Sequence, residues 1–172
     1  VCVPSPSTED GHCDTSILES TLKDLFLINF KDSVPIICKT TAPPSVYEQL
    51  QQSYPNIVHC PEFLTARNHI KDYHTTDNFV LGGDMKFCEL ARNVIQSGNV
   101  MNKNFIMTDI KSASLFKYMM NSYLATKVTF MNDFKKLADL EEVDWHGIKE
   151  LSRHDCRIGT THMDVPGPDG EY

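Results

Sequence analysis

The sequence predicts an α/β fold, in which a mostly parallel sheet is followed by a long helix and a small all-α region. The first observation is that short β-branched runs alternate with stretches of helical apolar spacing up to residue 107. The second is that residues 112–139 contain neither Pro nor Gly and carry one broad apolar stripe. The third is a length of 172 residues with 41% hydrophobic composition, which suffices for a sizeable core.

The first elements follow from local patterns. The chain opens on Val-Cys-Val and then Pro-Ser-Pro-Ser, which predicts the end of a buried strand at a turn. Helical spacing of apolar residues predicts a helix over 14–29. A β-branched run over 34–38 predicts a strand, which a polar turn at 39–41 separates from a helix over 43–53 that opens with two prolines.

The same alternation continues toward the middle of the chain. Residues 56–60 and 79–81 predict two more strands, joined by an irregular, polar connection. Gly82-Gly83 is most simply a turn. A helix is expected over 85–97 and a further strand over 105–107. Because strands alternate with helices, we expect the sheet to be mostly parallel.

The long helix over 112–139 starts a second region. Such a helix after a βαβ region typically leaves the sheet domain, so we place a boundary near residue 108. Residues 1–108 are then the sheet domain, and residues 109–172 form a helical domain of two or three helices.

Charge and composition exclude some partners. Sixteen basic against 23 acidic residues give a net charge of −7 without a basic run, whereas nucleic acids and anionic membranes require a concentrated positive field. We therefore expect neither partner. The six cysteines lie far apart without a CxxC pair, which favours free thiols in a reducing compartment. With no signal-peptide pattern at the start, a cytoplasmic location is expected.

Lys117 and Asn121 stand out on the long helix. They are four residues apart, hence on one face, and both interrupt the apolar stripe. An ammonium and a carboxamide held together can stabilise an oxygen that becomes negative during a reaction. Spacing alone favours the alternative of a surface lysine beside an asparagine on a half-exposed helix.

Three further segments lie where strands are predicted to end, which is where open α/β sheets bind ligands. Glu62 follows one strand and could serve as a base, or it could be a solvated turn residue. Thr41 follows another and could bond a hydroxyl or water, cap the next helix, or do both. Val3 to Ser7 would form a third element at this edge.

Other motifs carry weaker signals. Arg157 lies in Asp-Cys-Arg-Ile-Gly, and its planar guanidinium suits phosphate or hydroxyl recognition. The seven histidines have no paired ligand spacing, so no metal site is predicted. The sequence contains neither a GxGxxG motif nor a P-loop.

Seven short motifs occur in order along the chain: Val-x-x-Pro-Ser-Pro-Ser, Lys-Thr-Thr-x-Pro, Cys-Pro-Glu-Phe-Leu, Phe-x-Leu-Gly-Gly, Leu-Phe-Lys-Tyr-x-x-Asn-Ser-Tyr-Leu-Ala, Phe-Met-Asn-Asp and Asp-x-Arg-Ile-Gly. In this order and spacing they resemble the UDP-glucose 6-dehydrogenase family, over nearly the whole chain. The resemblance implies that residues 1–108 are the C-terminal part of a Rossmann-like NAD-binding domain and that 109–172 are a truncated central dimerisation domain. It also reverses the preference for structural roles at Thr41, Glu62, Lys117 and Asn121.

The resemblance implies NAD-dependent oxidation of the C6 alcohol of UDP-glucose to the carboxylate, through a thioester on a cysteine. Lys117 and Asn121 would hold the oxyanion and the sugar, Glu62 would activate water, and Thr41 would orient water and substrate. The residues expected to touch substrate are Glu62, Phe63, Leu64, Thr65, Lys117, Asn121 and Arg157, the last across a homodimer made by the long helix. The residues expected to line the cofactor are Val3, Pro4, Ser5, Pro6, Ser7, Thr40, Thr41 and Ala42.

The chain departs from the family pattern in two respects. The family continues Pro-Glu-Phe-Leu with a variable residue and then Glu-Gly, where this chain has Thr65, Ala66 and Arg67. The family's Gly-rich loop would precede residue 1, and its catalytic cysteine would follow residue 172. We therefore expect an interior piece of a larger enzyme, inactive by itself.

Two alternatives remain at this level. Dehydrogenases of GDP-mannose or of UDP-N-acetyl-hexosamines share these motifs and differ largely in loops outside the chain. A non-catalytic remnant that keeps the dimerisation helix is the alternative from another class.

Overall fold

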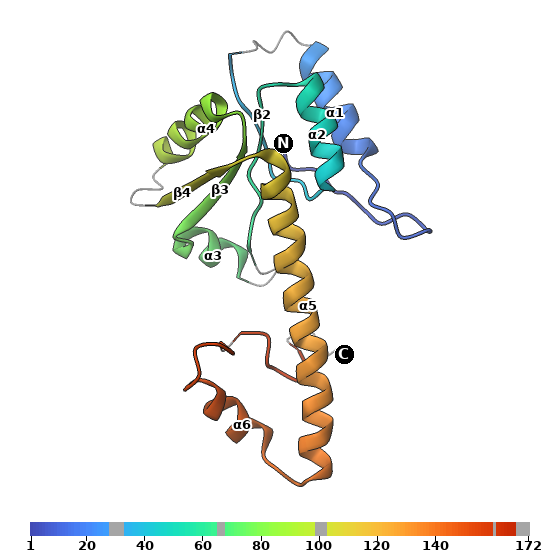
Figure 1. The fold of residues 1–172 in the computed structure, drawn as a ribbon, viewed down its shortest axis with the longest axis vertical. Coiled ribbons are helices and arrows are strands. Elements are labelled where there is room, and N and C mark those ends of the chain that lie inside the picture. Colours follow the sequence, from blue (N-terminus) through green and yellow to red (C-terminus); the bar gives the residue numbers. More distant parts are fainter. Residues whose placement is uncertain (28–32, 65–67, 99–102, 160, 168–172) are drawn as a thin grey trace. The chain divides into compact units, whose positions relative to one another are not determined.

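The computed structural model describes residues 1–27, 33–64, 68–98, 103–159 and 161–167 (Figure 1). The described residues form two compact units, Val1–Tyr118 and Met119–Tyr172. The division falls inside the long helix α5 (Ile110–Leu140), whereas the sequence placed the domain boundary near residue 108. The limits of the domains stay a prediction.

The first unit is built on a four-stranded sheet of order β1-β2-β3-β4. Its strands are β1 (Ile36–Cys38), β2 (Ile57–His59), β3 (Asn78–Gly83) and β4 (Asn104–Thr108). The β1–β2 and β3–β4 pairings are parallel, as expected, but β2 and β3 run antiparallel. The connection between β2 and β3 was predicted to be irregular, yet it contains the short helix α3 (His69–Thr75). None of the residues of α3 is buried, so α3 is not a crossover helix of the kind that returns a chain for parallel pairing.

Helices cover both faces of the sheet (Figure 1). On one face lie α1 (Ser16–Leu27) and α2 (Pro44–Ser53), and on the other lies α4 (Met85–Ser97). The core with α1 and α2 consists of Leu18, Leu22, Ile36, Cys38, Ala42, Tyr47, Leu50, Ile57 and Ile110. The core with α4 consists of Val58, Cys60, Phe79, Leu81, Phe87, Cys88 and Ala91.

The N-terminal residues Val1–Val3 were predicted to end a buried strand, and they form no regular strand. They nevertheless lie along β1. The amino group of Val1 donates to the carbonyl of Ile37 (2.6 Å), and the amide of Lys39 donates to the carbonyl of Val1 (2.9 Å). This segment therefore covers the outer edge of β1 with backbone hydrogen bonds.

Gly82 and Gly83 are not a turn, contrary to the prediction, but the last two residues of β3. A Cβ atom on Gly82 would lie 2.4 Å from the Cβ of Ala113 and 2.9 Å from the carbonyl oxygen of Asp109. Glycine at this position lets the first turn of α5 pack directly on the strand. The carboxylate of Asp109 accepts from the amide of Ser112 (2.8 Å), which caps that turn.

The second unit contains the remainder of α5 and the helix α6 (Trp145–Ser152). Its core is small and consists of Met131, Ala138, Trp145 and Met163. Asp144 begins α6 by accepting the amides of His146 and Gly147. None of the helices in the described ranges is long and apolar enough to cross a bilayer.

Candidate functional site

The central feature of the first unit is an ion pair between Lys117 and Glu62. The Nζ of Lys117 lies 3.2 Å from Oε1 of Glu62 and also donates to the backbone carbonyl of Glu62. Lys117 is 6% exposed, so the alternative of a surface lysine is wrong. Glu62 keeps about a third of its side chain exposed, so its carboxylate reaches both the buried ammonium and solvent.

An aromatic ring lies beside the ammonium of this pair. The Nζ of Lys117 lies 5.5 Å from the ring centroid of Phe63, within cation–π range. The Phe63 ring in turn packs edge-on against Phe116 at 5.5 Å. An ammonium in such a dry surround interacts strongly with any oxygen that develops negative charge near it.

Local structure explains how these residues meet. Glu62 and Phe63 follow β2, at the end of a fully buried strand. Lys39, just after β1, donates to the carbonyl of Cys60 (3.1 Å) and thereby ties the ends of β1 and β2 together. Lys117 reaches the same place from the second turn of α5.

The Thr40–Ala42 loop lies beside this helix. The hydroxyl of Ser114, 1% exposed, donates to the carbonyl of Ala42 (2.6 Å), and the hydroxyl of Tyr47 donates to the carbonyl of Thr40 (2.5 Å). Helix α2 begins with Pro43 at its N-cap and without a side-chain cap. The alternative of Thr41 as that cap is therefore wrong. Thr41 is half-buried.

The Val3–Ser7 strip lies against the same loop. Thr40 Oγ1 both accepts from the amide of Val3 and donates to its carbonyl, each at 3.0 Å. The hydroxyl of Ser5 donates to the carbonyl of Thr41 (2.6 Å). The structure thus brings together the two segments that were predicted to line a cofactor. The hydroxyls of Thr40 and Ser5 are used in these contacts, and the role of the two segments in holding the cofactor stays a prediction.

His59 is a buried residue next to this site that the sequence did not single out. Its ring stacks on Tyr47 with centroids 4.1 Å apart, and Nδ1 lies 3.2 Å from the carbonyl of Cys38. Nε2 is buried without a hydrogen-bond partner among the described residues. Desolvation lowers the pKa of His59 to about 4, helped by the nearby charges of Lys39 and Lys117. The imidazole is therefore neutral at physiological pH.

The six cysteines are free, and three of them are buried. Burial raises the pKa of Cys38 to about 12 and that of Cys88 to about 11. Burial also raises the pKa of Cys60, although Lys39 opposes the shift. These three thiols stay protonated at neutral pH, so none of them supplies a thiolate nucleophile.

The structure places the other predicted substrate residues in different surroundings. Phe63 and Leu64 are half-buried beside Glu62, whereas Thr65 lies outside the described residues. Asn121 is exposed and belongs to the second unit, as does Arg157. Their place in the site stays a prediction.

Sequence reasoning missed Ser114 and the bridging role of Lys39. Ser114 had a signal, because it lies three residues before Lys117 and hence on the same face of the helix. Lys39 was part of a named motif, but its contact with Cys60 depends on the pairing of β1 with β2.

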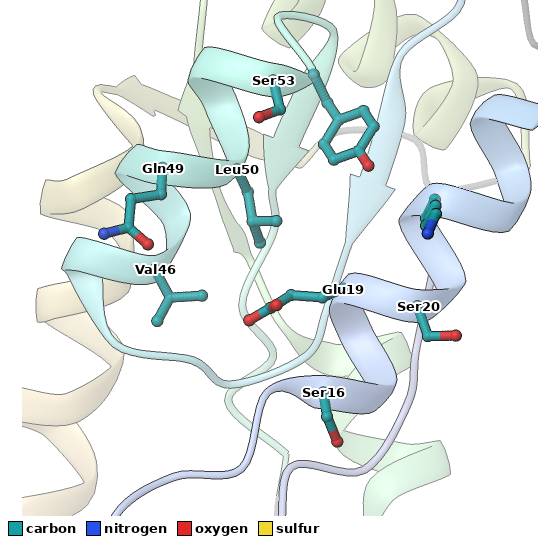
Figure 2. Close-up of a pocket in the computed structure, with 9 residues that line it drawn as sticks. Ser16, Glu19, Ser20, Val46, Gln49, Leu50 and Ser53 are labelled. Carbon is teal, nitrogen blue, oxygen red and sulfur yellow. The ribbon is translucent and has the colours of Figure 1, made fainter.

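A separate groove of about 560 Å³ lies between α1 and α2 (Figure 2). It is lined by Ser16, Glu19, Ser20, Lys23, Val46, Gln49, Leu50, Ser53 and Tyr54. None of the predicted site residues lines it, so the groove is no part of the Lys117–Glu62 site.

Family models account for most of the chain. Residues 1–98 match the NAD binding domain of the UDP-glucose/GDP-mannose dehydrogenase family, and residues 111–170 match its central domain. The chain belongs to this family. NAD is the cofactor of the domain that the first match describes. The matched residues include Glu62 in the first model and Lys117 in the second.

Individual relatives agree on the family and differ in substrate. The chain is 31% identical to a UDP-glucose 6-dehydrogenase of Rickettsia bellii, covering 98% of this chain and 40% of that protein. It is 29% identical to a UDP-N-acetyl-D-mannosamine dehydrogenase of Methanococcus maripaludis, covering 90% and 37%. These values do not separate one nucleotide sugar from another.

A solved structure confirms the α/β fold. A UDP-glucose dehydrogenase from Pyrobaculum islandicum superimposes with a TM-score of 0.77 at 22% identity, covering 94% of this chain and 40% of that one. The chain thus spans about 40% of the length of such relatives.

Proposed function

We propose that this chain is part of a UDP-glucose 6-dehydrogenase, which oxidises UDP-glucose to UDP-glucuronate with NAD. The observation that carries the proposal is the buried Lys117 paired with Glu62, whose side chain is about one third exposed, in a chain of the nucleotide-sugar dehydrogenase family. A buried cation beside a carboxylate that reaches solvent suits a reaction in which an alcohol becomes a carboxylate and water enters.

The roles of the two residues follow from their surroundings. NAD, when bound, accepts the hydride that leaves the alcohol carbon. Lys117 donates to an oxygen that becomes negative at the same carbon, because its ammonium is desolvated and held on the Glu62 main chain. Glu62 accepts a proton from water through the part of its carboxylate that solvent reaches.

The loop at Thr40–Ala42 and the Val3–Ser7 strip form the proposed cofactor surface. Their mutual hydrogen bonds fix the main chain, and Thr41 orients water and substrate beside the nicotinamide. Holding such groups in place before the ligand arrives reduces the entropy lost on binding.

The remaining assignments complete the proposal. Phe63, Leu64 and Thr65 contact the nucleotide sugar beside Glu62, Asn121 holds the sugar next to Lys117, and Arg157 reaches the substrate of a second copy in a homodimer made by α5. The free cysteines suit a reducing compartment, which favours the cytoplasm.

The test is a substrate panel on the full-length protein that carries this chain. UDP-glucose, GDP-mannose and UDP-N-acetyl-D-mannosamine are each incubated with NAD, and NADH is followed by absorbance. We expect two NADH per molecule of UDP-glucose and a kcat/KM at least about tenfold lower for the other two sugars, the difference that 1.4 kcal/mol of transition-state binding makes. A preference for another nucleotide sugar would reject the substrate and keep the family, and no NADH from any of the three would reject the activity.

A further inference from the structure

Lys127 in the second unit is buried without a carboxylate in its described surroundings. It lies on α5 and is 9% exposed. Its described hydrogen-bond partners are two main-chain carbonyls, those of Ile158 (2.9 Å) and Gly159 (3.3 Å). By contrast, Lys136 on the same helix is exposed and pairs with Asp133.

The burial of this ammonium has an energetic cost. Removing an ammonium from water is unfavourable by several kcal/mol unless hydrogen bonds replace its hydration. Desolvation accordingly lowers the pKa of Lys127. The two carbonyls of the turn replace part of this hydration, because an ammonium has three donors and can bridge both oxygens. The bridging holds the backbone of the turn to α5.

The turn so held is the segment Asp155–Gly159, which carries Arg157. The amide of Ile158 donates to the carbonyl of Asp155 (3.1 Å), and Gly159 adopts φ +67°, a conformation that favours glycine. The guanidinium of Arg157 lies on the carboxylate of Asp155 through Nε (2.9 Å) and Nη2 (2.5 Å), while its side chain is 86% exposed. The main chain of the turn is fixed, and the guanidinium of Arg157 is exposed to solvent.

We propose that Lys127 is a positioning residue: by bridging the carbonyls of Ile158 and Gly159, it fixes the turn that presents Arg157 to the oxygens of a nucleotide sugar. This inference rests on the substrate role proposed for Arg157. Lys127 acts through the turn and does not itself touch the substrate.

The first measurement is hydrogen exchange, which requires no substrate. In the full-length protein, Lys127→Gln removes the charge and shortens the side chain by one atom, which disrupts the bridge. The amides of the turn, including that of Ile158, should then exchange about tenfold faster, as expected from losing a charged hydrogen bond of about 1.5 kcal/mol. Lys136→Gln is the matched control and should leave the turn unchanged. An unchanged exchange rate in Lys127→Gln overturns the proposal whatever the enzyme does.

The second measurement is a double-mutant cycle on the KM for the nucleotide sugar. Lys127→Gln and Arg157→Gln should each raise this KM by about tenfold or more and leave the KM for NAD unchanged. Because one residue acts through the other, the double variant should be no worse than Arg157→Gln alone, within about twofold. Multiplied effects would overturn the positioning role.

The outcomes separate the two hypotheses. If Arg157→Gln leaves the KM unchanged, the substrate role of Arg157 and the proposal built on it are both rejected, while faster exchange in Lys127→Gln would still show the bridge. If Lys127→Gln does not fold, Gly159→Ala tests the turn from its other side, since alanine is strained at this φ. Lys127→Arg, whose guanidinium keeps the charge and can donate to both carbonyls, should retain most of the nucleotide-sugar affinity, and failure to do so counts against the bridge.

Discussion

The two units treat their polar site residues in opposite ways. In the first unit, Lys117 is buried, paired with Glu62 and fixed by its neighbours. In the second unit, Asn121 and Arg157 are exposed, and the described core contains only four buried apolar residues. The sheet, with helices on both faces, holds its site lysine away from water, whereas the second unit buries Lys127 but presents both of its predicted site residues to solvent.

The second unit also carries exposed apolar side chains. Large side chains are exposed along α5 and α6: Met119, Tyr123, Phe130, Phe134, Leu137, Leu140, Ile148 and Leu151. Phe130 and Phe134 pack on each other at 4.5 Å yet remain about half exposed. The first unit also exposes large apolar side chains, among them Leu115 and Phe116 on the first turns of α5, so the contrast between the units lies in their polar site residues.

The largest expected effect comes from removing the buried charge of the first unit. Lys117→Met in the full-length protein should lower kcat for nucleotide-sugar oxidation by about 100- to 1,000-fold, as loss of one donor to a developing oxyanion does. Lys111→Met is the control on the same helix, because Lys111 is exposed and pairs with Glu48. Equal turnover in the two variants would reject the catalytic role of Lys117.

A second effect tests the packing that supports this charge. Gly82→Ala should lower the free energy of unfolding by about 3 kcal/mol and Tm by about 6 to 12 °C, because the new Cβ overlaps α5. Calorimetry of the purified protein measures it. Gly98→Ala, whose Cβ would meet the carbonyl of Ile95 at 3.4 Å and no other atom of the described ranges, should change Tm by less than about 2 °C. A similar small change in Gly82→Ala would mean that the strand and helix do not touch.

A third effect depends on pH. The pKa of His59 is about 4 in the folded protein and 6.5 in the unfolded chain, so between these values only the unfolded state takes up the proton. Above pH 6.5 the histidine is neutral in both states, so the free energy of unfolding does not depend on its titration. As the pH drops from 6.5 to 4, the free energy of unfolding falls by roughly 3 kcal/mol.

His59→Phe should remove this part of the acid sensitivity while keeping a ring against Tyr47. Urea unfolding at pH 7, 5.5 and 4 should show that the free energy of unfolding of the variant rises relative to that of the wild type as the pH is lowered. The exposed His154→Gln serves as the control. A constant difference between variant and wild type across this range would contradict the prediction.

The smallest effect lies in the second unit. Gly147 occupies the first turn of α6, and a Cβ there would meet only the carboxylate of Asp144 at 3.4 Å. Gly147→Ala should stabilise the protein by about 0.5 kcal/mol, since alanine favours the helix, and raise Tm by about 1 to 2 °C. A fall in Tm would show that the cap at Asp144 tolerates no extra atom.

Most of the fold could be predicted because its signals are local. The helix at 85–97 agrees with the structure to the residue, and the four strands of the sheet agree within two residues, since Pro, Gly and polar turns mark their ends. The strand predicted at residues 1–3 is absent. The antiparallel pairing of β2 with β3 could not be predicted, because it depends on how the 18-residue connection at 60–77 returns and not on the strands themselves. For the same reason Gly82-Gly83 looked like a turn although it forms the end of a strand.

The candidate site was predictable only in part. Helical spacing connected Lys117 with Asn121, four residues away, but the partner that the structure gives Lys117 is Glu62, 55 residues away in the sequence. Such a contact requires the sheet, because Glu62 lies in the loop after β2 and the packing of α5 positions Lys117. The motif order assigned both to one site, and the pairing itself had no local signal.

The contact of Gly82 with Ala113 fixes more than packing. Ala113 lies one helical turn before Lys117, so the point where the strand touches α5 also sets the angle at which Lys117 leaves the helix. A slip of one residue would rotate Lys117 by about 100° and take its ammonium away from Glu62. The absence of a side chain at position 82 therefore fixes the rotation of α5 about its axis, and natural variation there should be limited by catalysis as much as by stability.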